Sequence, residues 1–196
     1  MARRTLVDID DRLLDAVMDI GAHEGIQGIT TVKVAKMCGV SHFTCFDHFG
    51  TKQNLLDQAA AKFEIDYLKI IMKHLPDAKS VGELWLMVLG DLMKNSNGAI
   101  YYLNYFLTFG YVIFPQNANP DVAKIALVKH FGELKDFTDE TYALVWDHFT
   151  NQCIVYAAYF AKRPMVDTPE NRELFKDLVF NGIDKLVGRP TELNPQ

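Results

Sequence analysis

The chain has 196 residues, 49 % of them apolar, and a net charge of −5. This length allows one or two domains with a sizeable core, and this composition excludes a disordered chain. Its three cysteines fit no disulfide framework and suit the reducing cytoplasm. The N-terminal residues lack the apolar core of a signal peptide. The most apolar segment, 99–114, is shorter than the roughly 20 residues of a membrane span.

Apolar residues recur at spacings of three and four along the chain, and strand-like alternation is absent from the sequence. This periodicity predicts an all-α fold. Proline, glycine and a Ser80–Glu83 capping box mark where helices begin and end. The expected helices cover residues 8–24, 31–38, 42–48, 52–74, 81–95, 99–114, 120–135 and 138–162, and a last helix opens at 168–170 and ends at 188.

The two short helices at 31–38 and 42–48 have the pattern of a helix-turn-helix. Such helices cross at about 90–120° through a tight turn, which requires a small residue at the contact. Ala35 meets that requirement, and Gly39 can adopt a positive φ at the turn. Val40 and Cys45 are the expected apolar core residues of the motif. Ser41 is placed to cap the second helix, without a Glu or Gln to complete a capping box.

Residues 12–56 resemble the DNA-binding domain of the TetR family of transcriptional regulators. The residues that carry the resemblance are Arg12, Leu13, Ala16, Gly25, Thr30, Thr31, Val34, Ala35, Gly39, Val40, Ser41, His48, Phe49, Lys52, Leu55 and Leu56. The resemblance implies an N-terminal three-helix helix-turn-helix domain at 1–52 and a C-terminal helical ligand-binding and dimerisation domain at 53–196. The helix 52–74, about 33 Å long, would join them. Phe46 departs from the family pattern, which usually has a tyrosine whose hydroxyl reaches a DNA phosphate.

Residues at the start of the second short helix are expected to contact DNA, because the N-terminal residues of a recognition helix reach base edges in the major groove. Phe43 can pack on a thymine methyl group. Lys52 can hold a phosphate at the start of the following helix. The candidate DNA-binding residues are Thr31, Lys33, Ser41, His42, Phe43, Thr44, His48 and Lys52.

The charge balance of the N-terminal region limits the DNA affinity that we expect. Residues 1–62 contain seven Lys or Arg and eight Asp or Glu. However, Lys33, Lys36 and Lys52 flank the expected recognition helix, and the local footprint matters more than the total charge. We therefore expect modest non-specific affinity and a shallow salt dependence.

Cysteine and histidine side chains near the turn raise the question of a zinc site, because both residue types bind zinc. His42 and His48 would point about 240° apart on one helix. Cys38 and Cys45 occupy positions where the motif needs core residues. We therefore expect buried structural cysteines and no metal site or other cofactor.

The C-terminal part is rich in aromatic residues, which fall on shared helix faces. Most are expected to be core, but ligand sites in helical bundles also lie between such helices. The candidate pocket residues are Trp85, Tyr102, Asn104, Phe106, Phe109, His130, Trp146, Phe149, Gln152 and Cys153.

A second face of helix 138–162 carries small residues, which allow close helix approach. The resemblance implies that the last two helices of each subunit form a four-helix dimer interface. Its candidate residues are Ile154, Ala157, Ala158, Ala161, Phe175, Val179, Gly182, Ile183 and Leu186. A dimer also suits a palindrome whose half-sites are about 34–36 Å apart. The alternative is packing within one chain.

Motifs of nucleotide-binding loops, nucleophile elbows and paired metal-binding histidines are missing from the sequence, so no enzyme is expected. The sequence and the resemblance predict a cytoplasmic, homodimeric transcriptional regulator that binds a palindromic operator on double-stranded DNA. A repressor released by a small apolar or aromatic molecule is the favoured form. The alternative is a helical small-molecule-binding protein or enzyme that has lost specific DNA binding, which the acidic N-terminal domain and Phe46 would favour.

Overall fold

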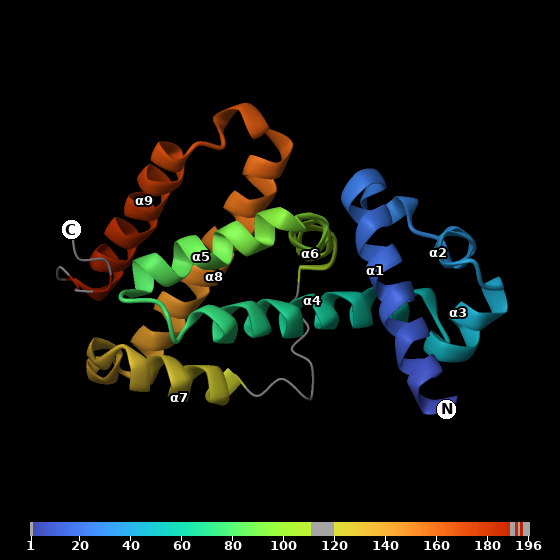
Figure 1. Ribbon diagram of the computed structural model, residues 1–196, viewed down its shortest axis with the longest axis horizontal. Helices are drawn as coiled ribbons and strands as arrows, with labels where there is room; N and C mark the ends of the chain where they lie inside the picture. The colour runs from blue at the N-terminus through green and yellow to red at the C-terminus, as the bar shows by residue number, and fades with distance from the viewer. Residues whose placement is uncertain (1, 111–119, 189–190, 192, 194–196) are drawn as a thin grey trace. The chain divides into compact units, whose positions relative to one another are not determined.

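The structure is a computed structural model that describes residues 2–110, 120–188, 191 and 193. For residues 2–8, 120 and 121 it describes the backbone alone. The described residues are helical, which confirms the all-α class. None of their helices is long and apolar enough to cross a membrane. The elements are α1 Ala2–Gly28, α2 Thr31–Cys38, α3 His42–Phe49, α4 Lys52–His74, α5 Val81–Lys94, α6 Asn97–Phe109, α7 Pro120–His130, the 3₁₀ turn η1 Gly132–Asp136, α8 Asp139–Lys162, the 3₁₀ turn η2 Pro164–Val166 and α9 Pro169–Val187 (Figure 1).

Several helix ends differ from the sequence prediction. The helix predicted at 8–24 begins at Ala2 and continues to Gly28 across a kink at Gly25, where φ is 72°. The helix α6 begins at Asn97 rather than at residue 99. The predicted helix 99–114 ends at Phe109, because Gly110 adopts a positive φ of 71°; residues 111–114 lie outside the described residues. The predicted helix 120–135 ends at His130. There Phe131 takes an extended conformation and the next residues form η1, which buries Leu134. A glycine directly after Phe131 favours this break, because glycine lowers helix stability.

The described residues form two compact units. The first contains α1, α2, α3, the part of α4 up to Asp66, and α6. The second contains the rest of α4 from Tyr67, together with α5, α7, α8 and α9. These units are defined by packing. The functional division into 1–52 and 53–196 is a separate matter and stays a prediction.

In the first unit, α6 is fastened to α1 and α4. The buried Tyr101 hydroxyl donates to the Leu56 carbonyl at 2.7 Å, and the Asn104 side chain donates to the Gly21 carbonyl at 3.1 Å. Gly21 has to be glycine at this crossing, because a Cβ there would collide with the Tyr101 ring. The Tyr105 hydroxyl adds a bond to Asp57 at 2.7 Å. These contacts place α6 in the same unit as the helix-turn-helix.

In the second unit, α5 packs on α8 and α8 packs on α9 (Figure 1). The indole N–H of Trp85 on α5 donates to the Phe149 carbonyl on α8 at 3.2 Å, and both side chains are buried. Phe175 on α9 lies against the rings of Tyr156 and Phe160 on α8, with centroids 4.5 and 5.3 Å apart. An aromatic core therefore holds these three helices together.

Candidate DNA-contact surface and effector cavity

The turn between α2 and α3 is built as the sequence predicts. Gly39 has φ 68° and ψ 30°, which confirms the expected left-handed position. The Val40 N–H donates to the Ala35 carbonyl at 3.0 Å, a Schellman-type helix end. From α1, the Arg12 guanidinium donates to the Cys38 carbonyl at 2.7 Å. A positive charge at the C-terminal end of α2 also suits the helix dipole. These bonds fix how α3 leaves the turn.

Side-chain caps define where α2 and α3 begin. Ser41 accepts a hydrogen bond from the Thr44 N–H at 3.3 Å, which confirms the expected cap of α3. Either of the adjacent residues Thr30 and Thr31 could cap α2. The structure selects Thr30, which accepts from the Lys33 N–H at 3.2 Å, so Thr31 is the first helical residue.

One face of α3 packs against the rest of the first unit and the other is exposed. Cys45 and Phe49 are buried, and Cys38 on α2 is buried as well, which confirms the expectation of structural cysteines. On the opposite face, the side chains of Phe43 and Phe46 are 66 % and 62 % exposed. The Phe43 ring lies against the exposed His42 ring, with centroids 4.1 Å apart. The start of α3 therefore presents aromatic rings rather than charges.

Two of the predicted DNA contacts already have partners in the protein. Lys33 forms an ion pair with Glu24 on α1. The Nδ1 atom of His48 lies 2.5 Å from a carboxylate oxygen of Asp10, also on α1. Lys52, in contrast, is exposed at the start of α4. Contact of Lys33 with a phosphate thus requires it to leave Glu24, whereas Lys52 is available as it stands.

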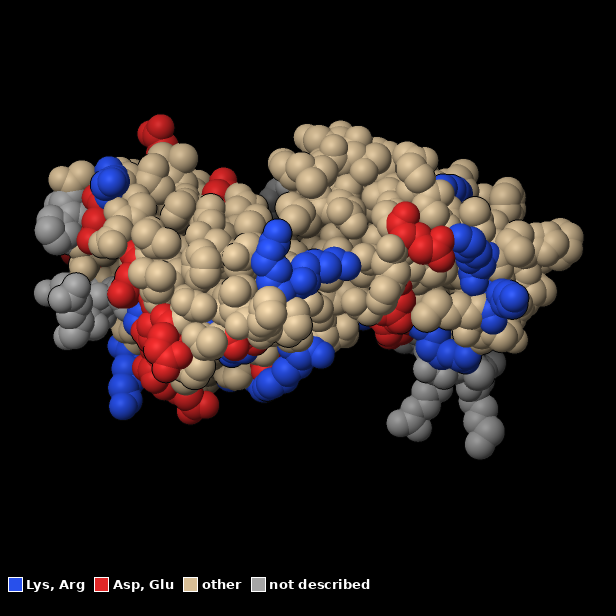
Figure 2. Space-filling model, turned by 90° about the horizontal axis from the view of Figure 1, so that it is seen from above, with Lys and Arg blue, Asp and Glu red and all other residues tan. Residues whose placement is uncertain are grey.

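The candidate DNA-contact residues are brought together on α2, on α3 and at the start of α4, all in the first unit. Figure 2 shows Lys and Arg side chains over the α2 and α3 end of this unit, with carboxylates among them. The outermost atoms of that end in this view belong to neither acidic nor basic residues. The surface is mixed rather than uniformly basic, as the charge count predicts. DNA contact by these residues stays a prediction.

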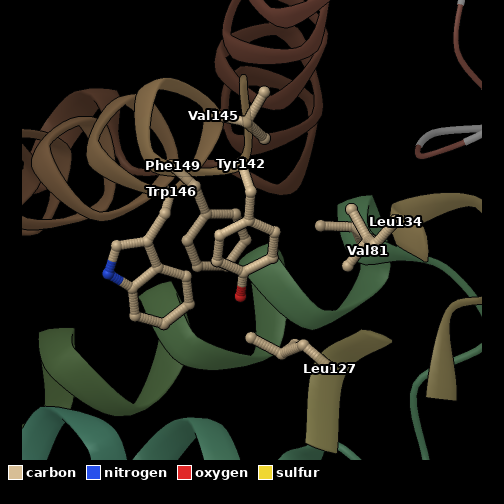
Figure 3. A pocket seen from close by; sticks show the side chains of 7 residues that line it. All are labelled: Val81, Leu127, Leu134, Tyr142, Val145, Trp146 and Phe149. Atoms are coloured by element: carbon tan, nitrogen blue, oxygen red, sulfur yellow. The ribbon is translucent and has the colours of Figure 1, made fainter. Parts of the chain in front are cut away.

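A small apolar cavity lies in the second unit, between α5, α7, η1 and α8. It has a volume of about 20 Å³, which is room for a single water. The rings of Tyr142, Trp146 and Phe149 stack along α8 with centroids 6.4 and 6.0 Å apart and planes within 10°. The lining residues are Val81, Leu127, Leu134, Tyr142, Val145, Trp146 and Phe149 (Figure 3).

The Tyr142 hydroxyl is the polar feature of this cavity. It is buried and has no hydrogen-bond partner among the described residues. Burial also raises the pKa of this phenol, so it stays protonated and can donate a hydrogen bond. Figure 3 shows the hydroxyl directed toward Leu127, on the far side from Val145. A buried hydroxyl without a partner costs free energy, which a bound polar atom would recover.

Of the predicted pocket residues, Trp146 and Phe149 line this cavity. Trp85 and Cys153 are buried core residues, and His130 lies 2.8 Å from the Ala78 carbonyl at a separate polar cleft. Gln152 is half-buried on α8. The remaining candidates are on α6 in the first unit: Tyr102, Asn104, Phe106 and Phe109. Ligand contact by any of these residues stays a prediction.

The sequence prediction missed Tyr142 as a pocket residue, although it precedes Trp146 by four positions in the same aromatic stripe. Helical spacing was the available signal. Leu127 and Leu134 carried no such signal, because they reach the cavity only through the packing of α7 and η1 on α8.

Most of the predicted dimer residues are buried within the single chain. Their exposed fractions are between 0 and 7 %, so they belong to the core of the second unit rather than to its surface: Ile154, Ala157, Ala158, Val179 and Ile183. Gly182 faces His148, which would lie 2.8 Å from an added Cβ. Ala161 and Phe175 are half-buried, and Leu186 is exposed. The small-residue face of α8 is thus largely covered within the chain, and a dimer interface formed by these residues stays a prediction.

A short helix pair turned at a glycine, a long following helix and a helical bundle define the class: this is the fold of TetR-family transcription regulators. A TetR-family transcription regulator from Marinobacter aquaeolei matches with a TM-score of 0.64 and 13 % identity, over 92 % of this chain and 97 % of that chain. A TetR-family member from Streptomyces coelicolor matches with a TM-score of 0.58 and 20 % identity, over 88 % and 96 %.

The multidrug binding protein EbrR, solved in complex with ethidium, matches with a TM-score of 0.55 and 20 % identity, over 88 % of this chain and 96 % of that chain. At these identities the likeness establishes the fold. No protein-family model and no curated protein matches the sequence.

Proposed function

We propose that this chain is a cytoplasmic, TetR-type transcriptional regulator that binds a palindromic operator as a homodimer and is released by a small apolar or aromatic effector. One observation carries the proposal. The eight-residue helix α3 packs against α2, and its His48 contacts Asp10 on α1, while His42 and Phe43 at its start are exposed. That is the arrangement of a recognition helix, whose N-terminal residues enter the major groove.

Phosphate contacts would position α3 on the duplex. Lys36 on α2 and Lys52 at the start of α4 are exposed, and they precede and follow α3 in the chain. Backbone phosphates are the expected targets of lysines that flank a recognition helix, because phosphate contacts fix the register without reading the sequence. Lys33 would join them once separated from Glu24.

The effector part of the proposal is supported by the cavity in the second unit. It is apolar, it lies between helices, and it contains a buried hydroxyl that lacks a partner in the described part of the chain. EbrR, which shares the fold, was solved with the aromatic molecule ethidium. Because the cavity holds only about 20 Å³, an effector larger than a water requires it to widen. A ligand that prefers the opened state shifts the population toward it.

A second candidate function is a helical ligand-binding protein without specific DNA binding. The ion pair of Lys33 with Glu24 and the exposed Asp47 on α3 favour it, because both reduce the attraction of this surface for phosphate. In that case the second unit would be the working part of the protein.

The deciding experiment is fluorescence-anisotropy binding of the purified protein to DNA fragments from upstream of its own gene, followed by a genome-wide selection. Lys52→Ala should weaken binding while the protein remains a dimer in ultracentrifugation. Lys94→Ala, which removes the same charge from an exposed position on α5, should have no effect. Weak binding that ignores sequence in both the fragments and the selection would favour the second candidate.

A further inference from the structure

The outward face of α3 has an unusual composition for a helix expected to read DNA. Its exposed residues are His42, Phe43, Phe46 and Asp47. Arginine and lysine bind guanine, and asparagine and glutamine bind adenine, through paired hydrogen bonds in the major groove. The sequence of α3, HFTCFDHF, contains none of these four residue types. This helix therefore lacks the usual means of reading purines.

The hydrogen-bonding capacity that remains on α3 is small. The Thr44 hydroxyl lies 3.1 Å from the Ser41 hydroxyl, which itself caps the helix by accepting from the Thr44 N–H. His48 is turned toward Asp10. His42 and Asp47 are the remaining exposed polar side chains of α3. Sequence selectivity must then come largely from the two rings.

Phe43 and Phe46 are suited to one chemical group of the major groove. The C5-methyl group of thymine is the apolar feature displayed there, and aromatic side chains pack on it. Three residues of helix separate the two rings by about 4.5 Å along the axis. The base-pair rise is about 3.4 Å, so the rings can reach neighbouring base pairs. Phe46 has no hydroxyl with which to bond a phosphate, which leaves apolar contact as its role.

We propose that Phe43 and Phe46 form a methyl-reading surface, which selects operator half-sites that carry thymine methyl groups opposite the start of α3. This proposal rests on the proposed function and says which bases of the operator the regulator would select. It also accounts for the exposure of two large apolar rings, which single-chain packing leaves uncovered among the described residues. Burial in the major groove would remove both from water.

The test begins with operators selected by the wild-type dimer from a random duplex library. Each thymine of the half-site is then replaced by deoxyuridine, which lacks only the methyl group. Loss of one buried methyl group should weaken binding about fourfold. In Phe43→Ala or Phe46→Ala, the sensitivity at the matching position should disappear. Both rings are mostly exposed, so the variants should fold.

Val32→Ala is the matched control, because Val32 is similarly exposed at 61 % but belongs to α2. It should keep the full methyl dependence. Tight selective binding without deoxyuridine sensitivity would overturn the proposal and leave the proposed function standing. Sensitivity that persists in both alanine variants would also overturn it, because the methyl groups would then act through DNA shape. Wild-type affinity in both variants would point to a protein partner for this patch, and failure to select any operator would overturn the function and the proposal together.

Discussion

Glu24→Gln should strengthen the binding of this protein to DNA of any sequence. In the structure Glu24 neutralises Lys33, and both side chains are 48 % exposed. Such an exposed pair contributes only about 0–1 kcal/mol to stability, so the fold should tolerate its loss. Once released, Lys33 can neutralise one phosphate. Each neutralised phosphate steepens the dependence of log K on log salt by about 0.9, which gives about 1.8 for a dimer with two copies of the surface.

The measurement is a salt series of anisotropy titrations with a duplex of random sequence. Glu173→Gln is the matched control. It removes the same charge from an ion pair with Lys176 on α9, in the second unit. Adding Lys33→Ala to Glu24→Gln should return the slope to the wild-type value. An unchanged slope in Glu24→Gln, or an equal change in Glu173→Gln, would refute the reasoning that the Glu24 carboxylate masks a phosphate contact.

Three further substitutions test the turn glycine, the hydroxyl in the cavity and a buried carboxyl group. Gly39→Ala should lower the free energy of unfolding in urea by about 1–2 kcal/mol, because alanine is strained at its positive φ; Gly132→Ala, which meets no such strain or neighbour, should cost much less. Tyr142→Phe should raise the stability of the effector-free protein by about 1–3 kcal/mol, because it removes a buried hydroxyl that has no partner among the described residues, and a decrease in stability would contradict this. Burial raises the pKa of Glu64, which accepts a hydrogen bond from Tyr102. The folded state therefore holds this proton to higher pH than the unfolded state does, and wild-type stability falls as pH rises through the interval between the two pKa values. Glu64→Gln should remove that part of the fall, and stability curves for the two proteins that run parallel from pH 4 to 8 would contradict it.

The sequence predicts local features of this fold well. The left-handed turn at Gly39 and the cap at Ser41 are set by single residues and their immediate neighbours. The same holds for the capping interaction of Ser80 with the Glu83 N–H at 3.1 Å. Such interactions span three or four positions, so they can be read without knowledge of the tertiary structure.

Features that depend on packing between distant segments could not be predicted. Periodicity identified the small-residue face of α8 that carries Ala157, but periodicity does not tell whether such a face is covered within the chain or by a second chain. The ion pair between Lys33 and Glu24 joins separate helices, and the cavity depends on Leu127 and Leu134 meeting α8. Likewise, nothing local indicated that Tyr101 and Asn104 would fasten α6 to α4 and α1, respectively.

The burial of every cysteine has a practical consequence. Cys38, Cys45 and Cys153 are free and buried, and burial raises the pKa of each thiol. Because the thiolate is the reactive form, these side chains should not react with maleimides or methanethiosulfonates at neutral pH. A cysteine introduced at exposed Val32 would then be the site of spin-labelling without prior removal of native thiols. Pulsed electron paramagnetic resonance on such a labelled dimer would measure the distance between the two labels, and so between the two recognition helices, with and without effector.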